Sequence, residues 1–269
     1  MSVKSLTHDL FSLKGRTALV TGGSRGIGRM IAQGFLEMGA RVYVSSRKAQ
    51  ACIDTAKELS EFGDCRPLPG DVSTVQGVHA LASAYSSYET TLDILVNNAG
   101  AAWLAPFDEF PEKGWDKVMD VNVKGVFFLT QALIGPLRAA AVQRHRPSKV
   151  INVASVDGLF VNPQETYSYG ASKAAVIMLT KRMALKLAPD QVMVSAIAPG
   201  AFPSDMNVAA RDQGDAIAKT IPSGRVGVDE DMAGAAIYLA SKAGDYVSGA
   251  VVVVDGGVTL VNASASMAD

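Results

Sequence analysis

The 269-residue chain has few cysteines, few histidines and almost no net charge, and these shortages exclude several classes of protein. Its two cysteines, Cys52 and Cys65, are too few for a disulfide framework, so free thiols are the expected state. The three histidines lie far apart without a cysteine or acidic partner at ligand spacing, so we predict no metal site. A formal net charge of -1 without a basic stripe predicts no nucleic-acid partner. No apolar run is long enough to span a bilayer, so we expect a cytoplasmic protein without membrane contact.

What the chain does contain is a regular alternation of strand-like and helix-like segments. Apolar and β-branched runs predict strands at 17–20, 41–47, 92–96, 149–155, 192–197 and 250–254, and a short strand within 64–72 that ends at Gly70-Asp71. Helical spacing predicts helices at 27–38, 49–62, 73–88 with Ser73 as N-cap, 113–141 with a kink or break at Pro136, 169–187 and 229–240. This alternation predicts an α/β fold of the Rossmann type, a single domain over residues 1–269 built on one doubly wound parallel sheet.

The first predicted strand runs into the glycine-rich stretch Thr21-Gly22-Gly23-Ser24-Arg25-Gly26-Ile27-Gly28. A strand, a glycine turn and a helix together offer free backbone N–H groups and a positive helix end to a pyrophosphate. The glycines fall as G-x-x-x-G-x-G, which differs from the commonest dinucleotide fingerprint. The alternative is a glycine turn that only packs the helix close to the strand.

Polar groups follow the later strands, where ligands bind in such sheets. They are the run Asn97-Asn98-Ala99-Gly100, Ser155, the pair Tyr169-x-x-x-Lys173, and Pro199-Gly200. In this order and context they resemble the short-chain dehydrogenase/reductase family, and the resemblance covers residues 13–258. It implies an oxidoreductase that forms a homo-oligomer, a dimer or tetramer, through helices like those at 113–141 and 169–187.

Tyr169 and Lys173 lie one helical turn apart, so their side chains share a face. An ammonium near a phenol favours the phenolate, so we expect a lowered pKa for Tyr169 and a role in proton transfer. Tyr167 lacks this partner, because Ala171 stands one turn beyond it. An ordinary exposed pair is the alternative.

The resemblance implies four catalytic residues. Tyr169 exchanges a proton with the substrate oxygen, and Lys173 also holds the nicotinamide ribose. Ser155 hydrogen-bonds the substrate carbonyl, and Asn122 bonds backbone and a water that feeds protons to the lysine. A turn or N-cap serine and a helix-kink asparagine are the respective alternatives.

Coenzyme choice depends on the end of the second strand, where NAD-dependent relatives carry an acidic residue that bonds the ribose hydroxyls. Here Ser46 takes that place, followed by Arg47 and Lys48, and Arg25 lies in the glycine loop. Because guanidinium groups attract a 2′-phosphate, we predict NADP, with NADPH as the working form. Solvated loop charges are the alternative for Arg47 and Lys48. The predicted coenzyme-binding residues are Gly22, Ser24, Arg25, Gly26, Ile27, Gly28, Ser46, Arg47, Asp71, Val72, Asn98, Ala99, Gly100, Tyr169, Lys173, Pro199 and Gly200.

Apolar residues near these motifs indicate a ketone substrate with an aliphatic arm. They are Trp103, Phe107 and Phe110, and, in a predicted substrate loop at residues 200–228, Phe202, Met206 and Ile221. Core or interface packing is an equal alternative for them.

Within the family the chain looks most like the 3-oxoacyl-[acyl-carrier-protein] reductases, in particular the branch tied to rhamnolipid biosynthesis. It departs from the fatty-acid enzyme at Ala101-Ala102-Trp103-Leu104, where that enzyme usually has Ile-Thr-Arg-Asp. We therefore predict NADPH-dependent reduction of a 3-oxoacyl thioester, linked to acyl carrier protein or CoA. A polyol, steroid or xenobiotic ketone is an alternative substrate, and a non-catalytic NADPH-binding protein is an alternative function.

Overall fold

Seven parallel strands form one sheet in the order β3-β2-β1-β4-β5-β6-β7. The computed structural model describes residue 7 and residues 9–261, so both ends of the predicted domain lie outside the described residues. The strands are β1 (Thr17–Thr21), β2 (Arg41–Ser45), β3 (Cys65–Pro67), β4 (Ile94–Asn97), β5 (Ser148–Val153), β6 (Val192–Pro199) and β7 (Val251–Val254). The strand order reverses between β1 and β4, which is the topological switch point of a doubly wound sheet. The predicted α/β fold class is therefore confirmed.

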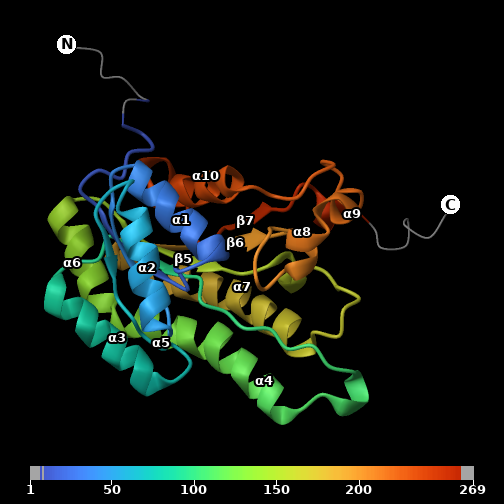
Figure 1. Cartoon of the computed structure of the whole chain (residues 1–269). Coiled ribbons are helices and arrows are strands. Elements are labelled where there is room, and N and C mark those ends of the chain that lie inside the picture. Colours follow the sequence, from blue (N-terminus) through green and yellow to red (C-terminus); the bar gives the residue numbers. More distant parts are fainter. Residues whose placement is uncertain (1–6, 8, 262–269) are drawn as a thin grey trace.

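Helices cover both faces of this sheet (Figure 1). One face carries α1 (Gly26–Glu37), α2 (Ala49–Leu59) and α10 (Asp229–Ala240). The other carries α3 (Val75–Tyr88), α5 (Gly125–Ala132), α6 (Ile134–Arg144) and α7 (Tyr167–Leu187), and the remaining helices are α4 (Glu112–Met119), α8 (Val208–Asp212) and α9 (Gly214–Ala218). Val20 and Leu19 are adjacent in β1 and fully buried in different cores, since successive strand residues point to opposite faces. Strands buried on both faces explain the continuous apolar runs in the sequence.

The predicted helix at 113–141 is three helices instead of one. A π-helical turn at Asp120–Lys124 joins α4 to α5, and the chain then bends by 53° before α6. The break falls at Leu133, three residues before Pro136. Proline fits the first turn of a new helix, where its missing N–H has no partner to lose, so Pro136 lies in α6 and the chain turns ahead of it. Among the described residues no single helix is long and apolar enough to cross a membrane, and only this bent pair passes by length and composition.

The structure also differs from the remaining expectations in detail. The N-cap of α3 is Thr74, whose hydroxyl accepts a hydrogen bond from the Gly77 N–H at 3.0 Å, whereas the Ser73 N–H donates to Asp71. The short strand expected within 64–72 is β3, which ends at Pro67 and not at the predicted Gly70-Asp71, and α7 begins at Tyr167 instead of Tyr169. The predicted substrate loop contains two short helices, α8 and α9, whose five residues each are too few to show periodicity.

Candidate active site

The glycine stretch makes a tight turn between β1 and α1. Gly22 and Gly26 have φ angles of +62° and +51°, which disfavour residues with side chains. A Cβ atom on Gly28 would lie 2.3 Å from the Gly22 carbonyl oxygen, so only glycine fits there. Helix α1 has no side-chain cap and no acidic residue in its first turn. Its N–H groups are therefore free to bind an anion, as the pyrophosphate prediction requires.

Thr21, which the motif reading did not single out, ties the ends of β1 and β4 together. Its hydroxyl accepts hydrogen bonds from the N–H groups of Asn98 and Ala99 at 3.0 and 3.1 Å and donates to Val96. The Asn98 amide donates back to the carbonyls of Thr21 and Gly22. The sequence feature that could have indicated this role is a hydroxyl residue between an apolar strand and a glycine turn.

The ends of β2 and β3 bring the predicted adenosine contacts together. The Gly70 N–H donates to the Ser46 carbonyl at 3.1 Å, which places Asp71 and Val72 beside the end of β2. The Ser46 hydroxyl donates to the Lys48 carbonyl, and the Arg47 side chain is exposed. Because Ser46 carries no charge, a ribose phosphate would meet no carboxylate from this position.

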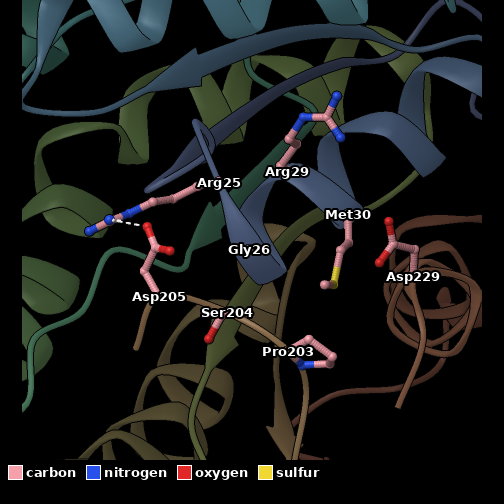
Figure 2. A pocket seen from close by; sticks show the side chains of 8 residues that line it. All are labelled: Arg25, Gly26, Arg29, Met30, Pro203, Ser204, Asp205 and Asp229. Carbon is pink, nitrogen blue, oxygen red and sulfur yellow. Dashed lines mark hydrogen bonds and ion pairs between the residues drawn. The ribbon is translucent and has the colours of Figure 1, made fainter. Parts of the chain in front are cut away.

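Arg25 points toward the predicted substrate loop, where it meets Asp205. Its guanidinium pairs with the Asp205 carboxylate at 2.5 Å, and the other Asp205 oxygen pairs with Arg211 at 2.8 Å. Figure 2 shows this pair at one side of a pocket of about 170 Å³ between the start of α1 and the loop, with Met30 and Asp229 on the other side. Both partners are largely exposed, so the ion pair is weak and leaves Arg25 free to move to another anion. No sequence motif marked Asp205, because the contact spans 180 residues.

The structure brings Ser155, Tyr169 and Lys173 together at the carboxyl edge of the sheet. The Lys173 ammonium is almost completely buried, donates to the Val153 carbonyl at 2.8 Å, and lies 5.5 Å from the centroid of the Tyr169 ring. Ser155 caps the short turn Val156–Gly158 by accepting a hydrogen bond from the Asp157 N–H. The N-cap alternative for Ser155 is therefore correct as a local description, and Ser155 also lies close enough to Tyr169 to lower its pKa.

The expected lowering of the Tyr169 pKa is wrong for this structure. Burial raises the pKa of Tyr169 to about 12, the hydrogen bond with Ser155 opposes this rise, and the negative charge of Asp157 adds to it. Burial also lowers the pKa of Lys173 to about 8, and here the negative charge of Asp157 acts against the effect of burial. Loss of water around the phenol is the largest influence on the pKa of Tyr169. Tyr169 therefore holds its proton at neutral pH.

Asn122 lies in the π-helical turn and is fully enclosed. Its amide accepts from the Ala101 N–H at 2.8 Å and donates to the Ala101 carbonyl and to the Ser172 hydroxyl, each at 2.9 Å. The predicted hydrogen bonds between Asn122 and the backbone are present. The helix irregularity that was the alternative explanation for Asn122 is present too, as the π-helical turn. Asn122 thus connects the segment after β4 to α7, one residue before Lys173.

The apolar residues near the site divide into two groups. Phe202 and Ile221 are buried, so core packing is the better description of them. Trp103 is covered by α4, where Lys113 and Lys117 lie over its ring. Phe107 and Met206 are exposed and remain available to a substrate, and Phe107 packs edge-on against Tyr167 together with Phe110.

The described part of the chain contains no cluster of three or more histidine, cysteine, aspartate or glutamate side chains that could hold a metal ion. Both cysteines are free and buried.

Comparison with known proteins places the chain in a family. The family described as "Enoyl-(Acyl carrier protein) reductase" matches residues 22–259. The chain therefore belongs to the short-chain dehydrogenase/reductase family, as its motifs predicted.

Individual relatives cover almost the whole chain. The rhamnolipids biosynthesis 3-oxoacyl-[acyl-carrier-protein] reductase of Pseudomonas aeruginosa is 48% identical over 256 residues, which is 94% of this chain and 100% of that protein. A solved structure titled as the Pseudomonas aeruginosa RhlG/NADP active-site complex has a TM-score of 0.90, with 47% identity over 94% of this chain and 100% of the other. A gluconate 5-dehydrogenase from Burkholderia cenocepacia, solved with NADP and tartrate, has a TM-score of 0.87, with 36% identity over 94% and 99% of the two chains.

Replacing Lys173 with methionine tests the buried ammonium through the pH dependence of stability. The folded-state pKa of Lys173, about 8, lies below its ordinary value of 10.5. Between these values the unfolded chain binds more protons, so the free energy of unfolding rises with pH. We expect Lys173 to contribute a rise on the order of 3 kcal/mol, which the Lys173→Met chain lacks.

The measurement is urea unfolding of both chains at several pH values from 7 to 10. Burial also lowers the pKa of Lys149 to about 8. Because Lys149 is present in both chains, its contribution cancels when the two free energies of unfolding are subtracted. Parallel pH curves for the two chains would contradict the prediction.

Proposed function

We propose that this chain is an NADPH-dependent reductase that converts a 3-oxoacyl thioester to the 3-hydroxyacyl form. The observation that carries the proposal is the meeting of Ser155, protonated Tyr169 and buried Lys173 at the end of β5. The similarity to a 3-oxoacyl reductase over its full length supports the substrate class. NADP in the titles of two similar structures supports the coenzyme.

The residues around the glycine turn fit the coenzyme. The uncapped N-terminus of α1 and the cradle at Gly22, Gly26 and Gly28 would hold the pyrophosphate, since a Cβ atom on Gly28 would close the cradle. Ser46 and Arg47 would meet the 2′-phosphate, with Arg25 able to join them. The remaining proposed contacts are Ser24, Ile27, Asp71, Val72, Asn98, Ala99, Gly100, Pro199 and Gly200.

The proposed chemistry divides between the coenzyme and four side chains. NADPH, when bound, supplies the hydride. Tyr169 protonates the substrate oxygen. Its raised pKa means that the phenol carries this proton at neutral pH in the coenzyme-free protein. Ser155 bonds the same oxygen and stabilises the charge that develops on it. Lys173 lies beside the phenol and would bind the nicotinamide ribose, and Asn122 holds the adjoining turn of α7 through Ser172.

We propose a cytoplasmic homo-oligomer, a dimer or tetramer, as the working form. Helices α4, α5 and α7 expose large apolar side chains, namely Trp115, Phe127, Met178 and Leu185. Exposed apolar groups on neighbouring helices are typical of subunit interfaces. Two buried free cysteines fit a reducing compartment.

A substrate panel tests the proposed function directly. The purified chain is mixed with NADPH and one of several ketones, and coenzyme oxidation gives kcat/KM for each. The panel contains 3-oxoacyl thioesters of acyl carrier protein, CoA and N-acetylcysteamine, together with a keto sugar acid, a steroid ketone and a simple cyclic ketone. We expect the thioesters to give the highest values, and a higher value for another ketone would replace the substrate class. Oxidation with none of them would favour the non-catalytic alternative.

Tyr169→Phe tests the proton donor. Removing a general acid lowers kcat by roughly a hundredfold to ten-thousandfold, while the ring still fills its place, so the Kd for NADPH should change less than about twofold. The matched control is Tyr167→Phe, because the Tyr167 hydroxyl bonds only the exposed Glu165 at 3.1 Å. We expect this control to keep most activity. Normal turnover in the Tyr169→Phe chain would refute the mechanism.

Arg47→Ala tests the phosphate contact. A charge-assisted hydrogen bond to the 2′-phosphate would be lost, so KM for NADPH should rise about tenfold while KM for NADH stays nearly constant. Arg182→Ala, on the exposed side of α7, is the control for loss of one surface charge. Equal effects of Arg47→Ala on both coenzymes would contradict the assignment.

A further inference from the structure

Asp157 places a carboxyl group in the catalytic turn, and the proposed mechanism gives it no role. Its N–H donates to the Ser155 hydroxyl at 3.1 Å, so the two residues share one tight turn. The next residue, Gly158, packs directly against α7, where a Cβ atom would lie 2.6 Å from the Lys173 carbonyl carbon. The backbone of the turn therefore fixes Asp157 beside the catalytic helix.

The Asp157 carboxyl group is held in place without an ion pair. The Asn162 amide donates to its two oxygens at 3.2 and 3.3 Å, and Asn162 is itself fixed by the Gln164 N–H at 3.0 Å. The Lys173 ammonium donates instead to the Val153 carbonyl. The negative charge of Asp157 nevertheless reaches both catalytic groups, since it raises the pKa of Tyr169 and supports the charged form of Lys173.

This arrangement balances the charge of the site. Lys173 supplies one positive charge and Asp157 one negative charge, so a neutral ketone meets little net field. A carboxylate two carbons from the reacting ketone would instead approach the Asp157 carboxylate. Like charges in a partly buried site repel each other more strongly than in water, so we expect discrimination of at least about tenfold. Without Asp157, the positive charge of Lys173 would be unopposed and would attract a ketone that carries a carboxylate.

We propose that Asp157 is a specificity-determining residue, whose carboxylate beside Ser155 and Lys173 makes the site select 3-oxo esters and thioesters over ketones that carry a carboxylate. This inference rests on the proposed reductase function and narrows its substrate class.

The test compares two ketones that share the acetoacetyl group and differ in charge. The kcat/KM with NADPH is measured for ethyl acetoacetate and for acetoacetate, and the ratio of ester to acid is the readout. The chains are wild type, Asp157→Asn, Asp157→Ser and the control Asp190→Asn. Asp190 follows the far end of α7, where its carboxylate pairs with Arg138, so the control removes an equal charge remote from Tyr169.

We expect the ratio to fall at least about tenfold in both Asp157 variants, mainly because turnover of the acid rises, and to stay constant in Asp190→Asn. The serine variant keeps the test valid if asparagine disturbs the turn. An unchanged ratio in the active Asp157 variants, or an equal fall in the Asp190 control, would overturn the inference. Because the ratio needs only a 3-oxo ester, a wild type that reduces it but rejects 3-oxoacyl thioesters would refute the proposed function separately.

Discussion

The buried ammonium of Lys173 is the constraint on which the catalytic end of the structure depends. A charged amine inside a protein needs a partner, and here the Val153 carbonyl at the end of β5 provides it. That carbonyl is available because β5 ends at Val153 and the chain turns at Ser155. The same turn presents the serine hydroxyl to Tyr169 and brings in Asp157. One hydrogen bond from the lysine thus fixes the position of strand, turn and helix together.

A second set of polar contacts lies inside the sheet just behind this site. The Asn97 amide donates to Asn152 at 2.9 Å and to Thr130 at 3.1 Å, and the Asn152 amide donates to Thr180 at 2.9 Å. All four side chains are buried. They connect β4 and β5 to α5 and α7, and a buried polar network with every member bonded favours one arrangement over its neighbours. The helix that carries Tyr169 and Lys173 is therefore held from the sheet side as well.

Local signals in the sequence were sufficient for most of the fold and failed where a distant contact decides the outcome. The alternation of apolar runs predicted all seven strands, because most of them are buried on both faces and are therefore continuous in sequence. The position of the helix break could not be predicted from Pro136 alone, since a proline that begins a helix and one that ends a helix look the same in sequence. The coming together of Ser155, Tyr169 and Lys173 followed from motifs, but the pKa of Tyr169 did not. Spacing shows the nearby ammonium and says nothing about burial, which is the larger influence here. Asp205 and Asp157 were missed because their importance arises from partners far along the chain or from a turn that only the folded backbone defines.

The carboxyl edge of the sheet is divided electrostatically into two regions with different tasks. Around β1 and β2 the uncapped start of α1, Arg25 and Arg47 give a positive region without an acidic residue at the Ser46 position. Around β5 the charges of Lys173 and Asp157 oppose each other. An anionic coenzyme and a neutral ketone would each find a matching environment at neighbouring strand ends. The Asp205 carboxylate reaches from the predicted substrate loop to Arg25 in the positive region. A phosphate bound in the positive region would compete with the Asp205 carboxylate for the Arg25 guanidinium. The position of the predicted substrate loop and the binding of coenzyme would therefore both depend on Arg25.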